Sequence, residues 1–275
     1  MKKNVISQIE LVITTKCSLK CKHCAHLIPH YCAFENGPAH ADTNEILETI
    51  RKLLDVVDKI DIFRVLGGEP FLHPEMYKIV DELKKSEKLE RIEVVTNATI
   101  VPSGNNLECL KGENLFVRIS NYGENSVKKE KLIECLENIK VKYTIHDCMK
   151  NKWGDLGEPF ERKRTIQELE RIYEKCFSRS IFIILDGKIY LCGRSAHSIK
   201  MGFSPADDFC IDILNGNKSS IIKGLNDLNN IRFLKTCDYC DGRRLGERYK
   251  EVEPAIQFTN SEIKRLKQNQ GGCEI

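Results

Sequence analysis

The amino-acid sequence predicts an α/β fold built on a parallel sheet with crossover helices. Over residues 8–147, short segments rich in β-branched residues alternate with segments whose apolar residues follow helical spacing. This alternation is typical of parallel sheets, because each helix carries the chain back to the start of the next strand. The five strands predicted in this half are too few for a closed eight-stranded barrel.

The elements of this half are predicted from apolar periodicity and from helix-start signals. Asp42-Thr-Asn-Glu45 is a capping box that opens the first helix, and Pro74 suits the first turn of the second. Residues 25–41, which are rich in His, Pro and Gly, are predicted to form a loop. The predicted strands are 8–14, 60–66, 91–96, 115–120 and 141–146, and the predicted helices are 42–57, 74–85 and 127–139, with a short one within 103–112.

The pattern changes after residue 147. Two apolar runs, Ile181–Leu185 and Lys188–Leu191, flank Asp186-Gly187, which suits the type I′ turn of a β-hairpin. We therefore expect a βα domain at 1–150 and a small cysteine-bearing domain at 151–275. The other predictions for this part are a loop at 147–159, which contains the single tryptophan, Trp153, and helices at 161–174, 219–234 and 260–268.

The charge balance gives no indication of a nucleic-acid or membrane partner. Lysine plus arginine (43) nearly equal aspartate plus glutamate (40), which leaves a net charge of +3. The N-terminus lacks the apolar core of a signal peptide, and no run approaches the ~20 apolar residues of a membrane span. We therefore expect a cytoplasmic protein. In that reducing compartment, 13 cysteines favour metal or cluster binding over disulfides.

Three of these cysteines form a compact group directly after the first predicted strand. Cys17, Cys21 and Cys24 have the spacing C-x3-C-x2-C. A cluster with four irons normally takes four thiolates, so three ligands from one loop leave one iron open to another molecule. A zinc site, or three buried thiols without a metal, is the alternative interpretation.

Polar or glycine-rich motifs stand at the ends of the next three strands. Gly67-Gly-Glu-Pro70 ends the second, Thr96-Asn97 the third and Ser120 the fourth. Successive parallel strands share one carboxyl edge, so these motifs are expected to lie beside the cysteine loop. The alternative is an ordinary turn or loop cap at each place. The sequence contains no G-x-G-x-x-G after the first strand and no P-loop motif, so the corresponding nucleotide-binding folds have no support.

Together these motifs resemble the radical S-adenosylmethionine (SAM) superfamily. The match comprises the cysteine spacing, the aromatic His23 before the last cysteine, and the Gly-Gly-Glu-Pro motif; Ala98 replaces the usual glycine after Asn97. The resemblance implies a partial (βα) barrel and a [4Fe–4S] cluster whose open iron is chelated by SAM. It further implies that one electron cleaves SAM to a 5′-deoxyadenosyl radical that abstracts hydrogen from the substrate. The cofactor contacts that it implies are His23, Gly67, Gly68, Glu69, Thr96, Asn97 and Ser120.

A second group of cysteines follows in the C-terminal part. Ten residues separate Cys176 from Gly187, four separate Gly187 from Cys192, and Cys237-x2-Cys240 comes later. Four thiols in this pattern suit either a structural zinc or a cluster. The pattern resembles the twitch domain, a shortened SPASM domain, and this resemblance implies one auxiliary [4Fe–4S] cluster. Because all four irons would be ligated, its implied role is electron transfer, which favours substrate oxidation.

Three functions remain open on the sequence. The first is an oxidoreductase that acts on a small polar molecule such as a sugar, aminocyclitol or nucleotide sugar, since the chain resembles the twitch-bearing dehydrogenases of aminoglycoside biosynthesis. It would use a flavodoxin- or ferredoxin-type electron donor. The second is a peptide-modifying maturase, either a crosslinking enzyme or an epimerase with Cys32, Cys148 or Cys210 as hydrogen donor. The third is a zinc-stabilised binding module without catalytic activity.

The substrate is expected against the loops after the fourth and fifth strands. Dehydrogenation of an alcohol needs a group that takes the hydroxyl proton, and Arg118, His146 and Asp147 are the candidates for assisting this transfer. Other polar or aromatic candidates in these loops are Asn121, Tyr122, Lys150, Lys152, Trp153 and Asp155, with Arg194 beside Cys192.

Overall fold

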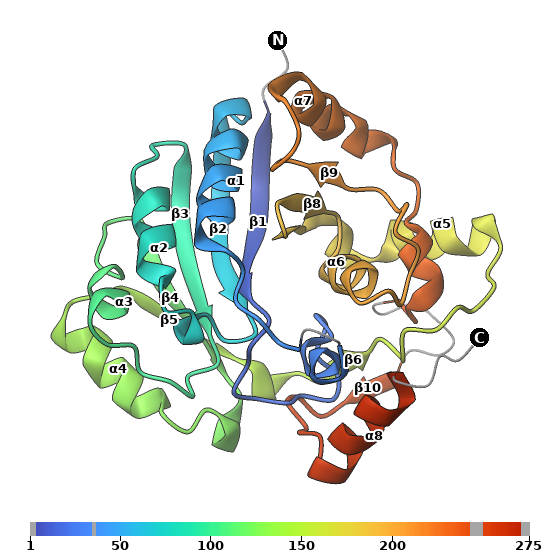
Figure 1. Ribbon diagram of the computed structural model, residues 1–275. Coiled ribbons are helices and arrows are strands. Elements are labelled where there is room, and N and C mark those ends of the chain that lie inside the picture. The colour runs from blue at the N-terminus through green and yellow to red at the C-terminus, as the bar shows by residue number, and fades with distance from the viewer. Residues whose placement is uncertain (1–3, 35–36, 243–249, 271–275) are drawn as a thin grey trace.

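The computed structural model describes residues 4–34, 37–242 and 250–270, and its centre is one sheet (Figure 1). The strand order is β5-β4-β3-β2-β1-β7-β8-β9. The first five strands lie side by side in chain order and every neighbouring pair is parallel, so the predicted α/β fold with a mostly parallel sheet is confirmed. These strands are β1 (Val5–Thr14), β2 (Lys59–Gly67), β3 (Leu89–Thr96), β4 (Leu115–Asn121) and β5 (Tyr143–Asp147).

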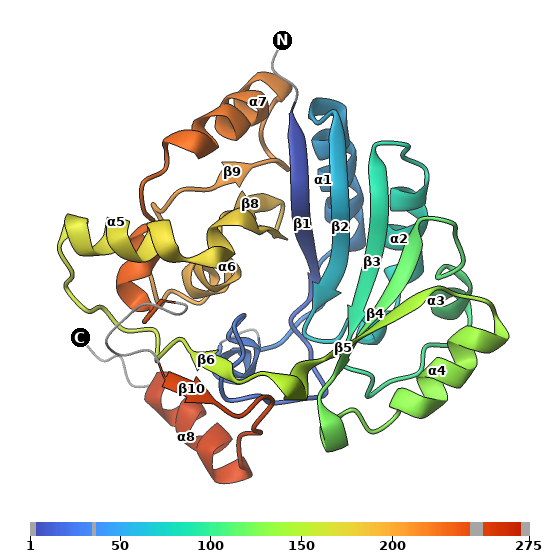
Figure 2. The same cartoon turned by 180° about the vertical axis from the view of Figure 1, so that it is seen from behind.

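Helices cover one face of these five strands, as the two opposite views show (Figures 1 and 2). The first begins where the capping box predicts, because the Asp42 carboxylate accepts hydrogen bonds from the backbone N–H groups of Asn44 and Glu45. Its apolar stripe packs on the sheet through Ile50 and Leu53, which are fully buried. The helices of this half are α1 (Thr43–Val56), α2 (Met76–Lys84), α3 (Asn105–Glu108) and α4 (Lys129–Asn138).

The predicted C-terminal hairpin joins the same sheet. β7 (Phe182–Leu185) pairs in parallel with β1, and β8 (Lys188–Tyr190) and β9 (Ile211–Asp212) follow in antiparallel order. Asp186 and Gly187 have φ angles of 48° and 72°, which agrees with a type I′ turn. The sheet and the main hydrophobic core therefore continue across residue 150, where a domain boundary is predicted.

Several C-terminal elements differ from the prediction. The segment 147–159 is not entirely a loop, because β6 (Trp153–Asp155) pairs with β10 (Lys250–Val252). Strands of three residues are too short to show an alternating pattern, so sequence periodicity misses them. Another element without a prediction is α6 (Gly193–Lys200). The remaining helices are α5 (Ile166–Lys175), α7 (Lys218–Asp227) and α8 (Asn260–Gln270).

Short 3₁₀ helices connect these elements. The most important for the site is η1 (Ile28–Ala33), which lies within the segment predicted as a loop, follows the cysteine loop and packs beside α8. The other 3₁₀ helices are Pro70–Leu72, Gly123–Asn125, Cys148–Lys150, Phe177–Ser180, Leu228–Asn230 and Lys235–Tyr239.

None of the helices in the described ranges is long and apolar enough to cross a membrane.

Candidate active site with two cysteine-lined cavities

The three N-terminal cysteines face a cavity of about 400 Å³ at the carboxyl edge of the sheet. This volume lies within the roughly 300–1,000 Å³ of small-molecule sites. The parallel register brings the ends of β2, β3 and β4 to the same cavity, as expected for this edge. Besides the cysteines, the cavity is lined by the predicted cofactor contacts His23, Gly67, Gly68, Thr96, Asn97 and Ser120.

The two glycines after β2 allow the sheet edge to touch the cysteine loop. The backbone N–H of Gly68 donates to the carbonyl of Thr14 at 2.8 Å. A Cβ at Gly67 would lie 2.2 Å from that carbonyl oxygen, and one at Gly68 would lie 2.1 Å from the carbonyl oxygen of Lys16. No side chain fits at either position, so the Gly-Gly pair is required by close backbone approach.

Glu69 lies behind the cavity and is not among its lining residues. Its fully buried carboxylate accepts hydrogen bonds from Thr96 Oγ1 at 2.9 Å, the backbone N–H of Asn97 at 2.9 Å and that of Phe71 at 3.2 Å. Burial raises the pKa of Glu69 to about 7, although these hydrogen bonds act in the opposite direction. In this structure the carboxylate joins the ends of β2 and β3, and its predicted contact with SAM stays a prediction.

Asn97 connects the end of β3 to the cysteine loop. Its Nδ2 donates to Ser18 Oγ at 3.2 Å and lies 3.6 Å from Cys17 Sγ, while its Oδ1 accepts from the backbone N–H of Thr99 at 3.0 Å. The next residue, Ala98, has a φ of 58°, a left-handed conformation that glycine adopts most easily. The backbone shape thus suits the glycine that the resemblance expects at this position.

The thiols of the first group are held among donors that suit thiolate ligands. Burial, together with the charge of Cys24, raises the pKa values of Cys17 and Cys21 to about 12. The backbone N–H of Leu19 donates to Cys17 Sγ at 3.4 Å, and Gln257 Nε2 donates to Cys21 Sγ at 3.2 Å. N–H donors of this kind stabilise cluster-bound thiolates. Three thiols from one loop and an adjoining cavity fit a [4Fe–4S] cluster with room for SAM.

A C-terminal segment that the sequence analysis missed closes the cysteine loop. The backbone N–H of Lys22 donates to the carbonyl of Ile256, and that of Phe258 donates to the carbonyl of Lys20, both at 2.8 Å. Gln257 lies between these two bonds and contacts Cys21. Figure 2 shows the dark blue loop after β1 beside β6 and β10. No local pattern marks residues 255–258 as part of the site.

The structure also brings the four C-terminal cysteines together. Cys176, Cys192 and Cys240 line a second cavity of about 160 Å³. Burial raises the pKa of Cys237 well above its ordinary value, and the charges of these three neighbouring thiols raise it further. Within the described ranges, no three His, Cys, Asp or Glu side chains form a group that could hold a metal ion as they stand. Arg194 lines the same cavity, and its buried Nε lacks a hydrogen-bond partner among the described residues, which fits an acceptor placed there.

Cys192 occupies the N-cap position of α6. Burial raises the pKa of its thiol to about 11, whereas the backbone N–H groups of Ser195 and Arg194 lower it. A helix N-terminus favours a thiolate, so this position suits a metal-ligating cysteine.

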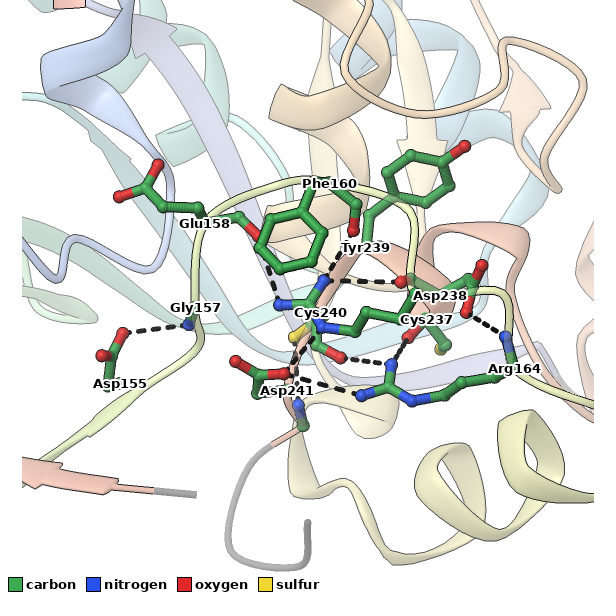
Figure 3. A network of polar contacts seen from close by, with 12 residues as sticks. Asp155, Gly157, Glu158, Phe160, Arg164, Cys237, Asp238, Tyr239, Cys240 and Asp241 are labelled. Carbon is green, nitrogen blue, oxygen red and sulfur yellow. Dashed lines mark hydrogen bonds and ion pairs between the residues drawn. The ribbon is translucent and has the colours of Figure 1, made fainter. Parts of the chain in front are cut away.

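A segment that we call the strap, residues 155–165, supports the Cys237-x2-Cys240 loop (Figure 3). Arg164 Nη1 donates to the carbonyl oxygens of Cys237 at 2.8 Å and Cys240 at 2.7 Å. In return, the Asp238 carboxylate accepts from the backbone N–H groups of Lys163 at 3.0 Å and Arg164 at 2.9 Å. The two segments thus fix each other, although about 75 residues separate them in sequence.

Part of the predicted substrate group lies at the first cavity. Tyr122, Lys152 and Trp153 line it, and the rings of Tyr122 and Trp153 meet edge to face at 5.6 Å. Asp155 contacts a lining residue, because its Oδ1 lies 3.2 Å from Nδ1 of His23.

The three candidates for proton transfer, Arg118, His146 and Asp147, are not among the residues that line this cavity. Asp147 accepts a hydrogen bond from the backbone N–H of Met149 at 3.2 Å. Burial and the nearby Arg118 lower the pKa of His146. Their catalytic role stays a prediction.

His26 is a further residue that the sequence analysis missed. Together with Ala25 it lines both cavities, so these two residues form part of the wall between them. Its ring stacks on that of His197 at 5.1 Å, and a Cβ at Gly193 would lie 2.6 Å from it. The only signal in the sequence is the position of His26 two residues after Cys24.

The fold and the site define an α/β scaffold with a cysteine centre at the carboxyl edge of a parallel sheet. Residues 11–145 match the family described as the radical SAM superfamily. The match covers 135 of the 275 residues, so this part of the chain is similar to that superfamily, and the solved structures described below share the fold.

Curated relatives match parts of the chain. Human molybdenum cofactor biosynthesis protein 1 is 34% identical over 91 residues, 33% of this chain and 14% of that protein. A GTP 3′,8-cyclase of Clostridium acetobutylicum is 26% identical over 198 residues, 62% of this chain and 60% of that enzyme. The chain thus spans less than two thirds of the length of either relative.

Among solved structures, native anSMEcpe with bound AdoMet shares 14% identity and a TM-score of 0.53, with 97% of each chain covered. Streptococcus suis SuiB bound to its precursor peptide SuiA has 11% identity and a TM-score of 0.50, with 87% of this chain and 72% of SuiB covered. At these identities the similarity demonstrates a shared fold.

Proposed function

We propose that this chain is a radical SAM oxidoreductase that dehydrogenates a small polar substrate such as a sugar, aminocyclitol or nucleotide sugar. Cys17, Cys21 and Cys24 would hold the SAM-binding cluster, and the four C-terminal cysteines would hold an auxiliary [4Fe–4S] cluster in a twitch-type arrangement. When bound, the first cluster supplies the electron that cleaves SAM, and the second accepts the electron released by the substrate radical. A flavodoxin- or ferredoxin-type protein would donate the first electron.

The observation that carries this proposal is the shared wall between the two cavities. Ala25 and His26 line both the cavity with Cys17, Cys21 and Cys24 and the cavity with Cys176, Cys192 and Cys240. A substrate in the first cavity would lie beside the second cysteine group. That placement suits a redox centre that takes an electron from the substrate, whereas a purely structural zinc site does not have to lie next to the substrate cavity.

The cavity supports a small polar substrate. Its volume of about 400 Å³ has to hold SAM as well, which leaves limited room for another molecule. The wall offers the amine of Lys152, the phenol of Tyr122 and the imidazole of His26 as hydrogen-bonding groups. The name of the relative GTP 3′,8-cyclase refers to a nucleotide, which is also a small polar molecule.

A peptide epimerase is the alternative, and Cys148 is the residue that supports it. None of Cys32, Cys148 and Cys210 lines the first cavity among the described residues. However, the Cys148 thiol forms hydrogen bonds with Ser120 and Tyr122, which do line it, and burial raises its pKa. Replacement of Cys148 by Ala should abolish turnover by an epimerase, whereas a dehydrogenase should retain it.

One anaerobic experiment tests the proposal. The chain is reconstituted with iron and sulfide, reduced in the presence of SAM, and assayed for 5′-deoxyadenosine. The Cys17/Cys21/Cys24→Ala variant should form none, yet it should keep the absorption of an iron–sulfur cluster at the second site. Bound zinc without iron, or no 5′-deoxyadenosine from the unmodified chain, would instead support a zinc-stabilised binding module.

A further inference from the structure

Arg194 is a buried cation directed at the second cavity. The residue is 4% exposed and lines this cavity with Cys176, Cys192 and Cys240. Nη2 donates to the backbone carbonyls of Gly157, in the strap, and Tyr239, in the Cys237-x2-Cys240 loop. These bonds hold the guanidinium at the cavity but leave its charge without a counter-ion.

The other charges around this cavity are compensated. Arg162 and Arg164 both pair with Asp241, at 2.7 and 3.6 Å, and the Asp238 carboxylate accepts from two backbone N–H groups of the strap. Glu10 also lines the cavity, but its carboxylate lies 3.2 Å from Arg64 Nη1. In the part of the chain that the structure describes, no ion pair includes Arg194, and its Nε has no hydrogen-bond partner.

An unpaired buried charge is unfavourable, so this arrangement calls for an anion in the cavity. Four thiolates outnumber the positive charges of a [4Fe–4S] core, and a ligated cluster is therefore an anion that becomes more negative when it gains an electron. A fixed cation beside it stabilises the reduced form more than the oxidised form. A guanidinium N–H directed at the cluster acts in the same direction, because hydrogen bonds to its sulfur atoms raise the reduction potential.

We infer that Arg194 raises the reduction potential of the auxiliary cluster and thereby makes it the better electron acceptor of the two centres. This inference rests on the proposed function, since it requires an iron–sulfur cluster at Cys176, Cys192, Cys237 and Cys240. Arg194 is a positioning residue: it neither ligates iron nor needs to touch the substrate. Its contribution is a desolvated charge that water does not screen.

The experiment uses the 275-residue chain with Cys17/Cys21/Cys24→Ala, in which only the proposed auxiliary cluster would form. The reconstituted protein is titrated with dithionite at controlled potentials, and the reduced cluster is counted by its electron paramagnetic resonance signal. We expect Arg194→Gln to move the midpoint to a more negative potential. Arg194→Lys, which keeps the charge but loses the planar N–H groups, should produce a smaller shift. Added salt should leave the unsubstituted midpoint nearly unchanged, because the charge is buried.

Arg232→Gln is the matched control. Arg232 is an exposed cation of the same part of the chain, 76% exposed and paired with Glu170, so its loss should not move the midpoint. If both Arg194 variants titrate at the unsubstituted potential, the inference is wrong while the auxiliary cluster stands. If the Cys17/Cys21/Cys24→Ala protein binds zinc or no metal, both the proposed auxiliary cluster and the inference about Arg194 are wrong. If Arg194→Gln prevents cluster formation, the inference is tested by the titration of Arg194→Lys instead. An Arg194→Lys midpoint equal to that of the unsubstituted protein, with an unchanged electron paramagnetic resonance signal, would contradict the inference.

Discussion

Gln257 donates a hydrogen bond from Nε2 to Sγ of Cys21 at 3.2 Å, across 236 residues of sequence. The same side chain accepts from the backbone N–H of Lys20 through Oε1 at 2.6 Å. Gln257 therefore contacts both a thiol of the cysteine loop and the backbone beside it. The C-terminal segment is in this way part of the candidate SAM site.

We predict that Gln257→Leu lowers the reduction potential of the SAM-binding cluster. This hydrogen bond is present in both redox states but stabilises the more negative, reduced cluster more, so only part of its about 1.5–3 kcal/mol changes the potential. The fraction of reduced cluster at fixed potential should therefore fall severalfold, with a similar fall in 5′-deoxyadenosine formation. Gln268→Leu, on an exposed position of α8, is the control. Equal rates for both variants would show that Gln257 only packs against the loop.

Gly68→Ala should prevent the cysteine loop from closing on β2. The new Cβ would lie 2.1 Å from the carbonyl oxygen of Lys16 and 2.8 Å from Cβ of Cys17, and backbone atoms cannot move aside cheaply. We expect a loss of at least ~2 kcal/mol, or roughly 4–8 °C in Tm, and loss of iron from the first site. Gly112→Ala is the matched control, because its Cβ would meet the nearest atom at 3.4 Å. Normal iron content in Gly68→Ala would contradict this prediction.

Arg164→Ala should weaken the auxiliary site selectively. The guanidinium forms hydrogen bonds with the carbonyls of both Cys237 and Cys240, and each such bond to a charged group contributes about 1.5–3 kcal/mol. In the Cys17/Cys21/Cys24→Ala background, we expect iron content to drop by at least half after desalting. Arg171→Ala, which removes an exposed arginine of α5, should retain iron. Equal iron in the two variants would argue against support by the strap.

Acid should destabilise the fold through His197. This side chain is fully buried, forms a 2.7 Å hydrogen bond with Tyr31 through Nδ1, and has a pKa well below the ordinary 6.5 because of burial. In the unfolded chain, the imidazole of His197 binds a proton as the pH falls below about 6.5, whereas in the folded chain the buried imidazole stays neutral. The stabilisation is therefore present above pH 6.5 and is lost as the pH falls below it, by up to about 1.4 kcal/mol per pH unit.

The corresponding measurement is Tm between pH 6.5 and 5. His197→Phe should remove roughly 3–5 °C per pH unit from the fall in Tm, even if its Tm at neutral pH is lower. His146→Phe removes an exposed imidazole and should change the slope far less. Parallel Tm profiles for unsubstituted protein and His197→Phe would mean that another group carries the acid sensitivity.

Much of the N-terminal half could be predicted because its signals are local. The capping box at Asp42 and the apolar periodicity after it define α1, and the β-branched runs define the strands. The same alternation predicts a parallel sheet, in which successive strands end at one edge. This was enough to place Cys17, Gly68 and Asn97 at one edge.

The second cavity was predictable only as a set of ligands. Cysteine spacing groups Cys176, Cys192, Cys237 and Cys240, but α6, β6 and β10 have too few residues to produce a periodic signal. The position of Arg194 therefore could not be derived, because it depends on how α6 and the strap pack together.

By itself, the sequence determined the parallel sheet, the loop with Cys17, Cys21 and Cys24 and the motifs at the strand ends, because each is recognised from residues that are close together in the chain. The four C-terminal cysteines could be grouped by their spacing alone. The tertiary structure alone decided that Gln257 contacts Cys21, that Glu69 is buried behind the cavity, and that His26 lies between the two cysteine groups. The physical reason is that these contacts join segments far apart in sequence. They form only when side chains compete for burial and hydrogen bonds in the packed protein, and no local pattern records that outcome.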